Sequence, residues 1–103
     1  MVNAFLSLVV INQNEEESLL ETVDDLFEQL NSITTQFELI IVDNCSSDSS
    51  VKILEEISLN DKYKNIQIYA LSHSVDMQTA AFAGIENALG DFVCIYNQIP
   101  TDQ

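Results

Sequence analysis

The chain has 103 residues, with 17 acidic side chains against three lysines and no arginine, and its formal net charge is −14 at pH 7. Such a charge repels nucleic acid and anionic membrane surfaces, so we expect no nucleic-acid partner. An apolar content of 47% is typical of a folded protein and predicts one domain over residues 1–103.

Apolar runs alternate with amphipathic segments along the chain. In chain order, the pattern predicts a strand over residues 5–11, a helix over 15–30, a strand over 37–42, a helix over 48–58, a strand over 66–71, a helix over 76–89 and a strand over 92–96. Asn14 and Glu17 have the spacing of a capping box, and Gly90 is expected to stop the third helix. This order predicts the α/β class, as a parallel sheet of about four strands with helices on both faces.

The second predicted strand ends in a polar turn. An apolar run stops at Asp43, and Asn44 and a serine-rich stretch follow it. Ligands of open α/β sheets bind outside the carboxyl ends of the strands, so Asp43 and Asn44 are candidates for holding one. A cluster that caps the next helix explains the same turn equally well.

Several common sites are excluded. With only two glycines, the chain contains neither GxGxxG nor GxxxxGK[ST], and it has no GxSxG. His73 stands alone in a predicted loop, and Cys45 and Cys94 are too far apart in sequence for a zinc motif. We expect a turn thiol at Cys45 and a buried strand thiol at Cys94, both reduced. No apolar run is long enough to span a membrane and no basic leader is present, so we expect a cytoplasmic location.

Four segments together carry a family resemblance: LVVINQNE at residues 8–15, VDNCSSD at 42–48, QTAAFAG at 78–84 and ALGDFV at 88–93. In order and spacing they resemble the family-2 glycosyltransferases of the GT-A fold, and most closely the branch that loads sugars onto polyprenyl phosphates. The resemblance covers the whole chain but only the N-terminal, nucleotide-binding half of such an enzyme. It implies a Rossmann-like half-domain that binds a UDP- or GDP-sugar.

The resemblance also implies roles for particular residues. The positions of Ile11, Gln13 and Glu15 border the base, those of Asp43 and Asn44 hold the uracil or ribose, and that of Gln78 lies near the nucleotide. A DxD motif after the fourth strand binds Mg²⁺ or Mn²⁺ and the diphosphate in the family.

The sequence departs from the family pattern at these same positions. Ile11 and Gln13 replace a proline and a tyrosine, Asn44 replaces an aspartate, and Cys45 replaces a glycine whose positive φ would be costly for cysteine. The DxD becomes NQI at residues 97–99, which leaves Asn97 as a weak metal ligand. Asp102 could reach a metal, but one carboxylate holds a divalent cation poorly.

Three functional hypotheses follow. The first is the donor-binding half of a glycosyltransferase, a truncated or short form that is inactive without an acceptor-binding half. The second is a non-catalytic module that binds a nucleotide or a protein. A receiver-like phosphoacceptor domain, the third, is disfavoured because no lysine follows Lys64. Because half a GT-A sheet leaves an edge strand open, we also expect self-association near residues 92–96 and the third helix.

Overall fold

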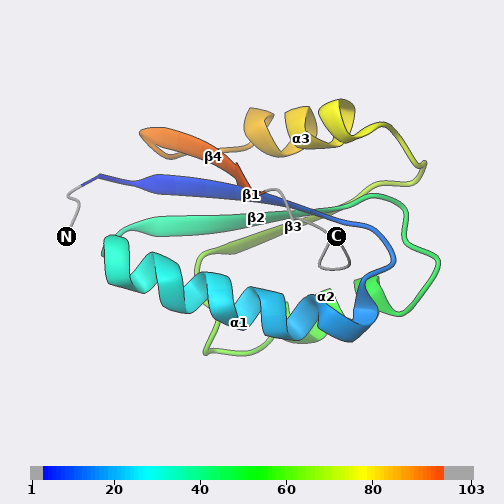
Figure 1. The fold of residues 1–103 in the computed structure, drawn as a ribbon, viewed down its shortest axis with the longest axis horizontal. Helices are drawn as coiled ribbons and strands as arrows, with labels where there is room; N and C mark the ends of the chain where they lie inside the picture. The colour runs from blue at the N-terminus through cyan, green and yellow to red at the C-terminus, as the bar shows by residue number, and fades with distance from the viewer. Residues whose placement is uncertain (1–3, 97–103) are drawn as a thin grey trace, which may run out of the picture.

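All seven predicted elements are present in the computed structural model, which describes residues 4–96 (Figure 1). The elements are β1 (Leu6–Asn12), α1 (Glu16–Ile33), β2 (Phe37–Asp43), α2 (Ser50–Ser58), β3 (Ile66–Ala70), α3 (Met77–Glu86) and β4 (Phe92–Tyr96). They form one parallel sheet in the order β3-β2-β1-β4. The predicted α/β class is therefore confirmed.

The strand at the centre of the sheet has the composition of a fully buried one. All seven residues of β2 are buried, because it lies between β1 and β3 and helices cover both of its faces. A parallel strand in this position reads as a continuous apolar run rather than an alternating one. Every strand runs in the same direction, so the carboxyl ends of β1, β2 and β3 lie side by side. We call this end of the sheet its carboxyl edge, which is distinct from the edge strands β3 and β4.

Two helices cover one face of the sheet and one helix covers the other (Figure 1). The larger core lies between the sheet and α1 and α2, where Phe27 packs edge-to-face against both Phe37 and Tyr63. The smaller core lies under α3 and includes Val9 and Ala80. The small side chains of α3 allow its close approach to the sheet.

Three expectations about individual residues are wrong. Asn14 does not cap α1: its φ is 55°, Glu15 is the residue before the helix, and the Asn14 side chain bonds the β2–α2 turn instead. Gly90 does not end α3, because the helix already stops at Glu86. Gly90 instead lies close to β1, where a Cβ on this residue would be 2.6 Å from Ser7 Oγ. Cys94 is exposed rather than buried, because β4 is an edge strand.

Candidate functional site

The ends of β1 and β2 are joined by a buried polar cluster. Asp43 is fully buried, and its carboxylate accepts hydrogen bonds from Asn12 Nδ2 at 3.0 Å, from the Ser46 backbone N–H at 3.0 Å and from Ser46 Oγ at 2.7 Å. A carboxylate that accepts from a backbone N–H three residues ahead closes a tight turn. In this structure Asp43 therefore shapes the turn before α2 rather than capping α2 itself.

The end of β2 is also joined to the segment that follows β3. Asn44 is 1% exposed, and its side-chain amide bonds both the N–H and the C=O of Val75. The Gln13 side chain donates to the Asn44 C=O at 3.0 Å and to Ser74 Oγ at 3.1 Å. Three segments that are distant in sequence thus meet in one hydrogen-bonded network at the carboxyl edge of the sheet.

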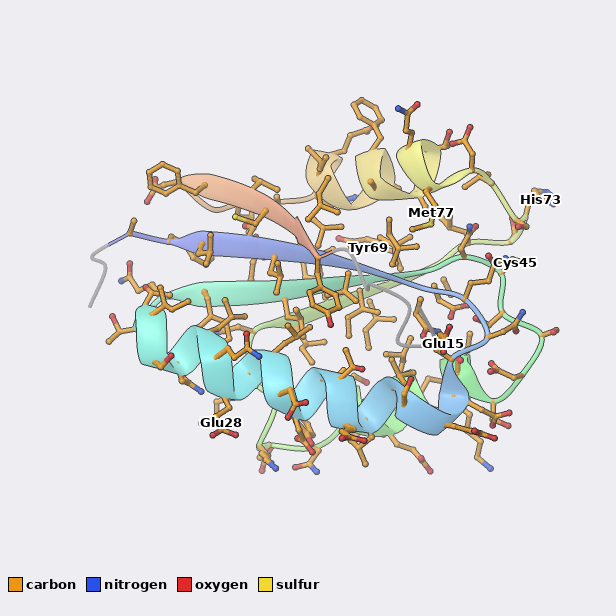
Figure 2. All side chains as sticks on the ribbon, viewed as in Figure 1. Glu15, Glu28, Cys45, Tyr69, His73 and Met77 are labelled. Carbon is orange, nitrogen blue, oxygen red and sulfur yellow. The ribbon has the colours of Figure 1, made fainter. Side chains whose placement is uncertain are left out.

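The predicted ligand-binding residues differ in exposure. Gln13, Glu15 and Gln78 are exposed, whereas Ile11 is half-buried and packs against the core under α3. In Figure 2, Glu15 lies at the same end of the molecule as Cys45 and His73, which are also exposed. The predicted roles of all these residues toward a nucleotide stay predictions, and for Asp43 and Asn44 the side chains already have partners within the protein.

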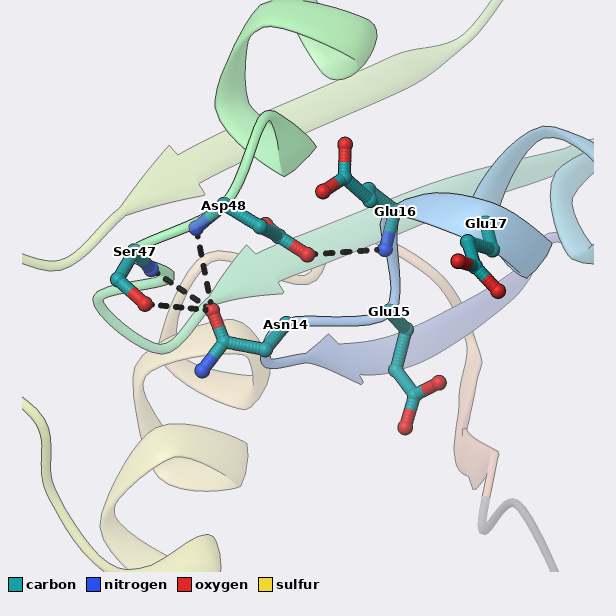
Figure 3. Close-up of a pocket in the computed structure, with 6 residues that line it drawn as sticks. All are labelled: Asn14, Glu15, Glu16, Glu17, Ser47 and Asp48. Atoms are coloured by element: carbon teal, nitrogen blue, oxygen red, sulfur yellow. Dashed lines mark hydrogen bonds between the residues drawn. The ribbon is translucent and has the colours of Figure 1, made fainter.

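A hollow of about 350 Å³ lies beside this edge, between the start of α1 and the turn before α2 (Figure 3). It is lined by Asn14, Glu15, Glu16, Glu17, Ser47 and Asp48. Asn14 Oδ1 accepts from the backbone N–H groups of Ser47 and Asp48. Four of the six lining residues are carboxylates, so the hollow repels a diphosphate.

Asp48 is fixed at one wall of this hollow. Its carboxylate accepts from the N–H groups of Ser50 at 2.9 Å and Glu16 at 3.1 Å. Hydrogen bonding by Ser50, and then by Glu16, lowers the pKa of Asp48 below its ordinary value. Asp48 therefore stays ionised and connects the beginnings of the two helices.

The two residues predicted to bind a metal, Asn97 and Asp102, lie outside residues 4–96, which are the residues that the structure describes. Within residues 4–96, no three histidine, cysteine, aspartate or glutamate side chains come together in a way that could hold a metal ion. These residues therefore do not form a site that fits Mg²⁺ or Mn²⁺, and we derive no chemical step through a metal.

Sequence reasoning missed part of the network. Asn12 and Ser46 give Asp43 its partners, and Ser74 and Val75 are joined to Gln13 and Asn44. The available signal for Asn12 was its position, because it is a polar residue directly after the apolar run of the first predicted strand. Nothing in the sequence distinguishes Ser74 and Val75 from other loop residues.

The sequence matches the Glycosyl transferase family 2 model over residues 7–98. The chain belongs to this family. It is 34% identical over 88 residues to an undecaprenyl-phosphate 4-deoxy-4-formamido-L-arabinose transferase of Proteus mirabilis, an alignment that covers 85% of this chain and 27% of the relative.

A second relative comes from Methanococcus voltae. It is a dolichyl N-acetyl-alpha-D-glucosaminyl phosphate 3-beta-D-2,3-diacetamido-2,3-dideoxy-beta-D-glucuronosyltransferase, 30% identical over 93 residues that cover 89% of this chain and 28% of the relative. The predicted resemblance to family-2 enzymes that act on polyprenyl phosphates is thus confirmed. The chain spans only 27% and 28% of the length of these two relatives.

Solved structures show the same fold. A mannosyltransferase from Pyrobaculum calidifontis in complex with GDP-Man and Mn²⁺ superposes with a TM-score of 0.80 at 17% identity, covering 90% of this chain and 27% of that one. S. aureus TarS 1-349 in complex with UDP gives a TM-score of 0.75 at 26% identity, covering 88% and 26%. The GT-A glycosyltransferase fold of the chain is therefore established. Within residues 4–96, no helix is both long and apolar enough to cross a membrane.

Proposed function

We propose that this family 2 chain binds the nucleotide part of a UDP- or GDP-sugar and does not transfer the sugar by itself. The relatives named above are sugar transferases, and the similar TarS structure was solved with UDP. The chain corresponds to about a quarter of each of these proteins. Donor recognition is the part of a transferase's task that a chain matching this share of its relatives can supply. A cytoplasmic location remains part of the proposal.

One observation carries the proposal: the network that joins Gln13, Asn44 and Ser74 lies at the carboxyl edge of the sheet, where open α/β folds bind ligands. Gln13 is exposed, and both N–H groups of its amide donate within the network, which leaves the amide Oε1 to accept from a donor on a base edge. Asp43 and Asn44 are buried, so their side chains would reach a ligand only by giving up present hydrogen bonds. We therefore assign the base contact to Ile11 and Gln13, and to Asp43 and Asn44 the positioning of the loops that hold the ribose.

The absence of sugar transfer is proposed on chemical grounds. A divalent cation, when bound, would neutralise the charge of the leaving diphosphate. In the sequence only Asn97 and Asp102 remain near the family's metal position, and the chain has no arginine that could replace the metal. Two of the three lysines, Lys62 and Lys64, precede β3 and thus lie toward the amino ends of the strands, and the third, Lys52, is an exposed residue of α2.

Calorimetric titration of the 103-residue chain with UDP, GDP and their sugars, with and without Mn²⁺, tests the proposal. We expect binding of one nucleotide that weakens about tenfold in Gln13→Ala, which corresponds to about 1.4 kcal/mol. Gln29→Ala, an exposed change on α1, is the matched control and should leave the affinity unchanged. Donor hydrolysis should stay at the level of buffer. The absence of any nucleotide binding would contradict the proposed donor recognition, and clear turnover would contradict the proposed inactivity.

The burial of Asp43 and Asn44 favours a second candidate, a module that has kept the fold for protein contacts alone. In that case both side chains serve only the fold. The same titration decides between the two, because this candidate requires that no nucleotide binds under any condition.

A further inference from the structure

A cleft between α1 and the loop before β3 lies apart from the carboxyl edge of the sheet. It has a volume of about 540 Å³. Its lining residues are Asp24, Phe27, Glu28, Asn31, Lys62 and Tyr63. Because α1 returns the chain from the end of β1 to the start of β2, its last turns lie toward the amino ends of the strands, and Figure 2 shows Glu28 far from Cys45 and His73. The cleft is therefore separate from the proposed nucleotide site and does not depend on it.

A cation of the chain itself already lies in this cleft. Lys62 Nζ is 3.3 Å from Asp24 Oδ1 and 5.3 Å from the centroid of the Tyr63 ring. The Tyr63 hydroxyl donates to the same carboxylate, and Phe27 packs edge-to-face on the Tyr63 ring. An aromatic face beside a carboxylate attracts ammonium and guanidinium groups. The Lys62 side chain is 67% exposed, so it can leave this position at little cost.

The helix beside the cleft carries negative charges that it does not balance itself. One face of α1 has an acidic row that ends in the cleft and consists of Glu17, Glu21, Asp24 and Glu28. These residues recur at the spacing of one helix face. The helix contains no basic residue, and like charges one turn apart destabilise a helix by about 0.2–0.5 kcal/mol per pair. A positively charged partner on this face would remove that repulsion.

We propose that this face of α1 binds a basic segment of a partner protein, with an arginine side chain of that segment in the cleft. The guanidinium takes the position of the Lys62 ammonium, where it stacks on the Tyr63 ring and bonds the Asp24 carboxylate. Arginine suits this position better than lysine, because its planar group can stack on an aromatic ring and bond a carboxylate through two N–H groups. Further basic side chains of the segment face Glu17 and Glu21.

The spacing of the carboxylates favours an extended partner over a metal ion. In the part of the chain that the structure describes, no three histidine, cysteine, aspartate or glutamate side chains come together closely enough to hold a metal ion. At 1.5 Å per helical residue the acidic row is about 16 Å long, which is the length of about five extended residues. The net charge of −14 attracts a basic partner from a distance, and the row and the cleft determine where the partner binds.

Fluorescence anisotropy of the full chain with labelled oligo-arginine and oligo-lysine peptides of equal length tests the proposal. In about 0.05 M salt we expect the arginine peptide to bind more tightly than the lysine peptide. Asp24→Asn removes the carboxylate charge but keeps an oxygen for the Tyr63 hydroxyl, and it should weaken binding of the arginine peptide about tenfold. Glu86→Gln, an exposed change at the end of α3 on the other face of the sheet, alters the net charge equally and should weaken binding by no more than about twofold.

The comparison separates a specific site from general attraction between opposite charges. Equal losses in Asp24→Asn and Glu86→Gln, or equal affinities for the two peptides, would show that only the net charge attracts basic peptides. Either result would overturn the proposal, as would the absence of any binding.

A variant expected to gain affinity keeps the test decisive if Asp24→Asn disturbs the fold. Lys62→Gln removes the cation that now occupies the cleft, so the arginine peptide should bind about threefold more tightly, whereas a disturbed fold would lose affinity. Lys64→Gln changes the net charge equally at an exposed residue that does not line the cleft, and it should give a smaller gain. Equal gains in the two variants would contradict the position assigned to the arginine.

Discussion

Asn44 hydrogen-bonds both backbone polar groups of Val75. Its Oδ1 accepts from the Val75 N–H at 2.9 Å, and its Nδ2 donates to the Val75 C=O at 2.7 Å. An aspartate, the residue of the family pattern at this position, could accept the first bond but, when ionised, could not donate the second. The asparagine therefore suits a position whose side chain ties the end of β2 to the segment before α3.

Asn44→Asp should lower the free energy of unfolding by about 1–3 kcal/mol at pH 7, because an ionised carboxylate would face a carbonyl oxygen. The loss should shrink as the pH falls to about 4, where a protonated carboxyl can donate again. Urea unfolding at the two pH values measures both effects. Asn31→Asp, on the exposed side of α1, is the matched control and should show neither. Equal stability of Asn44→Asp and the wild type at pH 7 would mean that the bond to the Val75 C=O contributes nothing.

The sequence predicted the elements well and their polar connections poorly. Apolar periodicity identified all seven elements, because it reports which face of each element is buried. The burial of Asp43 was not predictable, since an aspartate after a strand looks the same whether it faces a ligand or its own turn. Asn14 had the spacing of a helix cap but instead takes a positive φ and bonds Ser47 across the loops. Contacts between loops distant in sequence leave no local pattern.

Cys45 has a φ of 55°, so it takes the positive φ expected at the position where the family has glycine. A side chain in the left-handed region is strained by about 1–2 kcal/mol, and glycine avoids this at a somewhat smaller entropic cost. Cys45→Gly should therefore raise the Tm slightly or leave it unchanged, as measured by calorimetry. Ser47→Gly in the same turn has no positive φ to relieve and should lower the Tm. A Tm loss for Cys45→Gly equal to that for Ser47→Gly would show that Cys45 is not strained.

Glu38 is a buried carboxylate whose three partners all donate. Ser7 Oγ donates at 2.6 Å, Gln67 Nε2 at 2.5 Å and the Leu89 backbone N–H at 2.7 Å. Glu38→Gln places an NH₂ group against a donor in either orientation, so we expect a loss of about 1–3 kcal/mol in unfolding free energy. Faster amide hydrogen exchange at Leu89 should accompany it. Glu28→Gln on the exposed face of α1 should change neither quantity (Figure 2).

Gly84 sets the distance between α3 and the sheet. A Cβ at this position would lie 2.5 Å from Val9 Cγ1 and 3.2 Å from Val42 Cγ2, and both valines are buried and stiff. In Gly84→Ala, overpacking should lower the free energy of unfolding by about 1–3 kcal/mol. The better helix propensity of alanine should offset about 1 kcal/mol of this loss. In a double-mutant cycle, Val9→Ala should remove most of the cost of Gly84→Ala. An unchanged cost in the Val9→Ala background would mean that the clash with Val9 is not its source.

Asp76 caps α3 and makes its stability pH-dependent. Its carboxylate accepts from the Thr79 N–H at 2.7 Å, and hydrogen bonds from the Thr79 side chain and backbone lower the pKa of Asp76. Because the pKa of Asp76 is lower in the folded protein than its ordinary value of 3.8, the stabilisation is complete when the pH is above 3.8. It is lost as the pH falls through the pKa that Asp76 has in the folded protein. Asp76→Ala should therefore lower the Tm at pH 7, and the difference from wild type should narrow below about pH 4. Asp61→Ala, an exposed change outside any helix, is the control. A Tm difference for Asp76→Ala that stays constant from pH 7 to about pH 2.5 would show that the charge on Asp76 does not contribute to the cap.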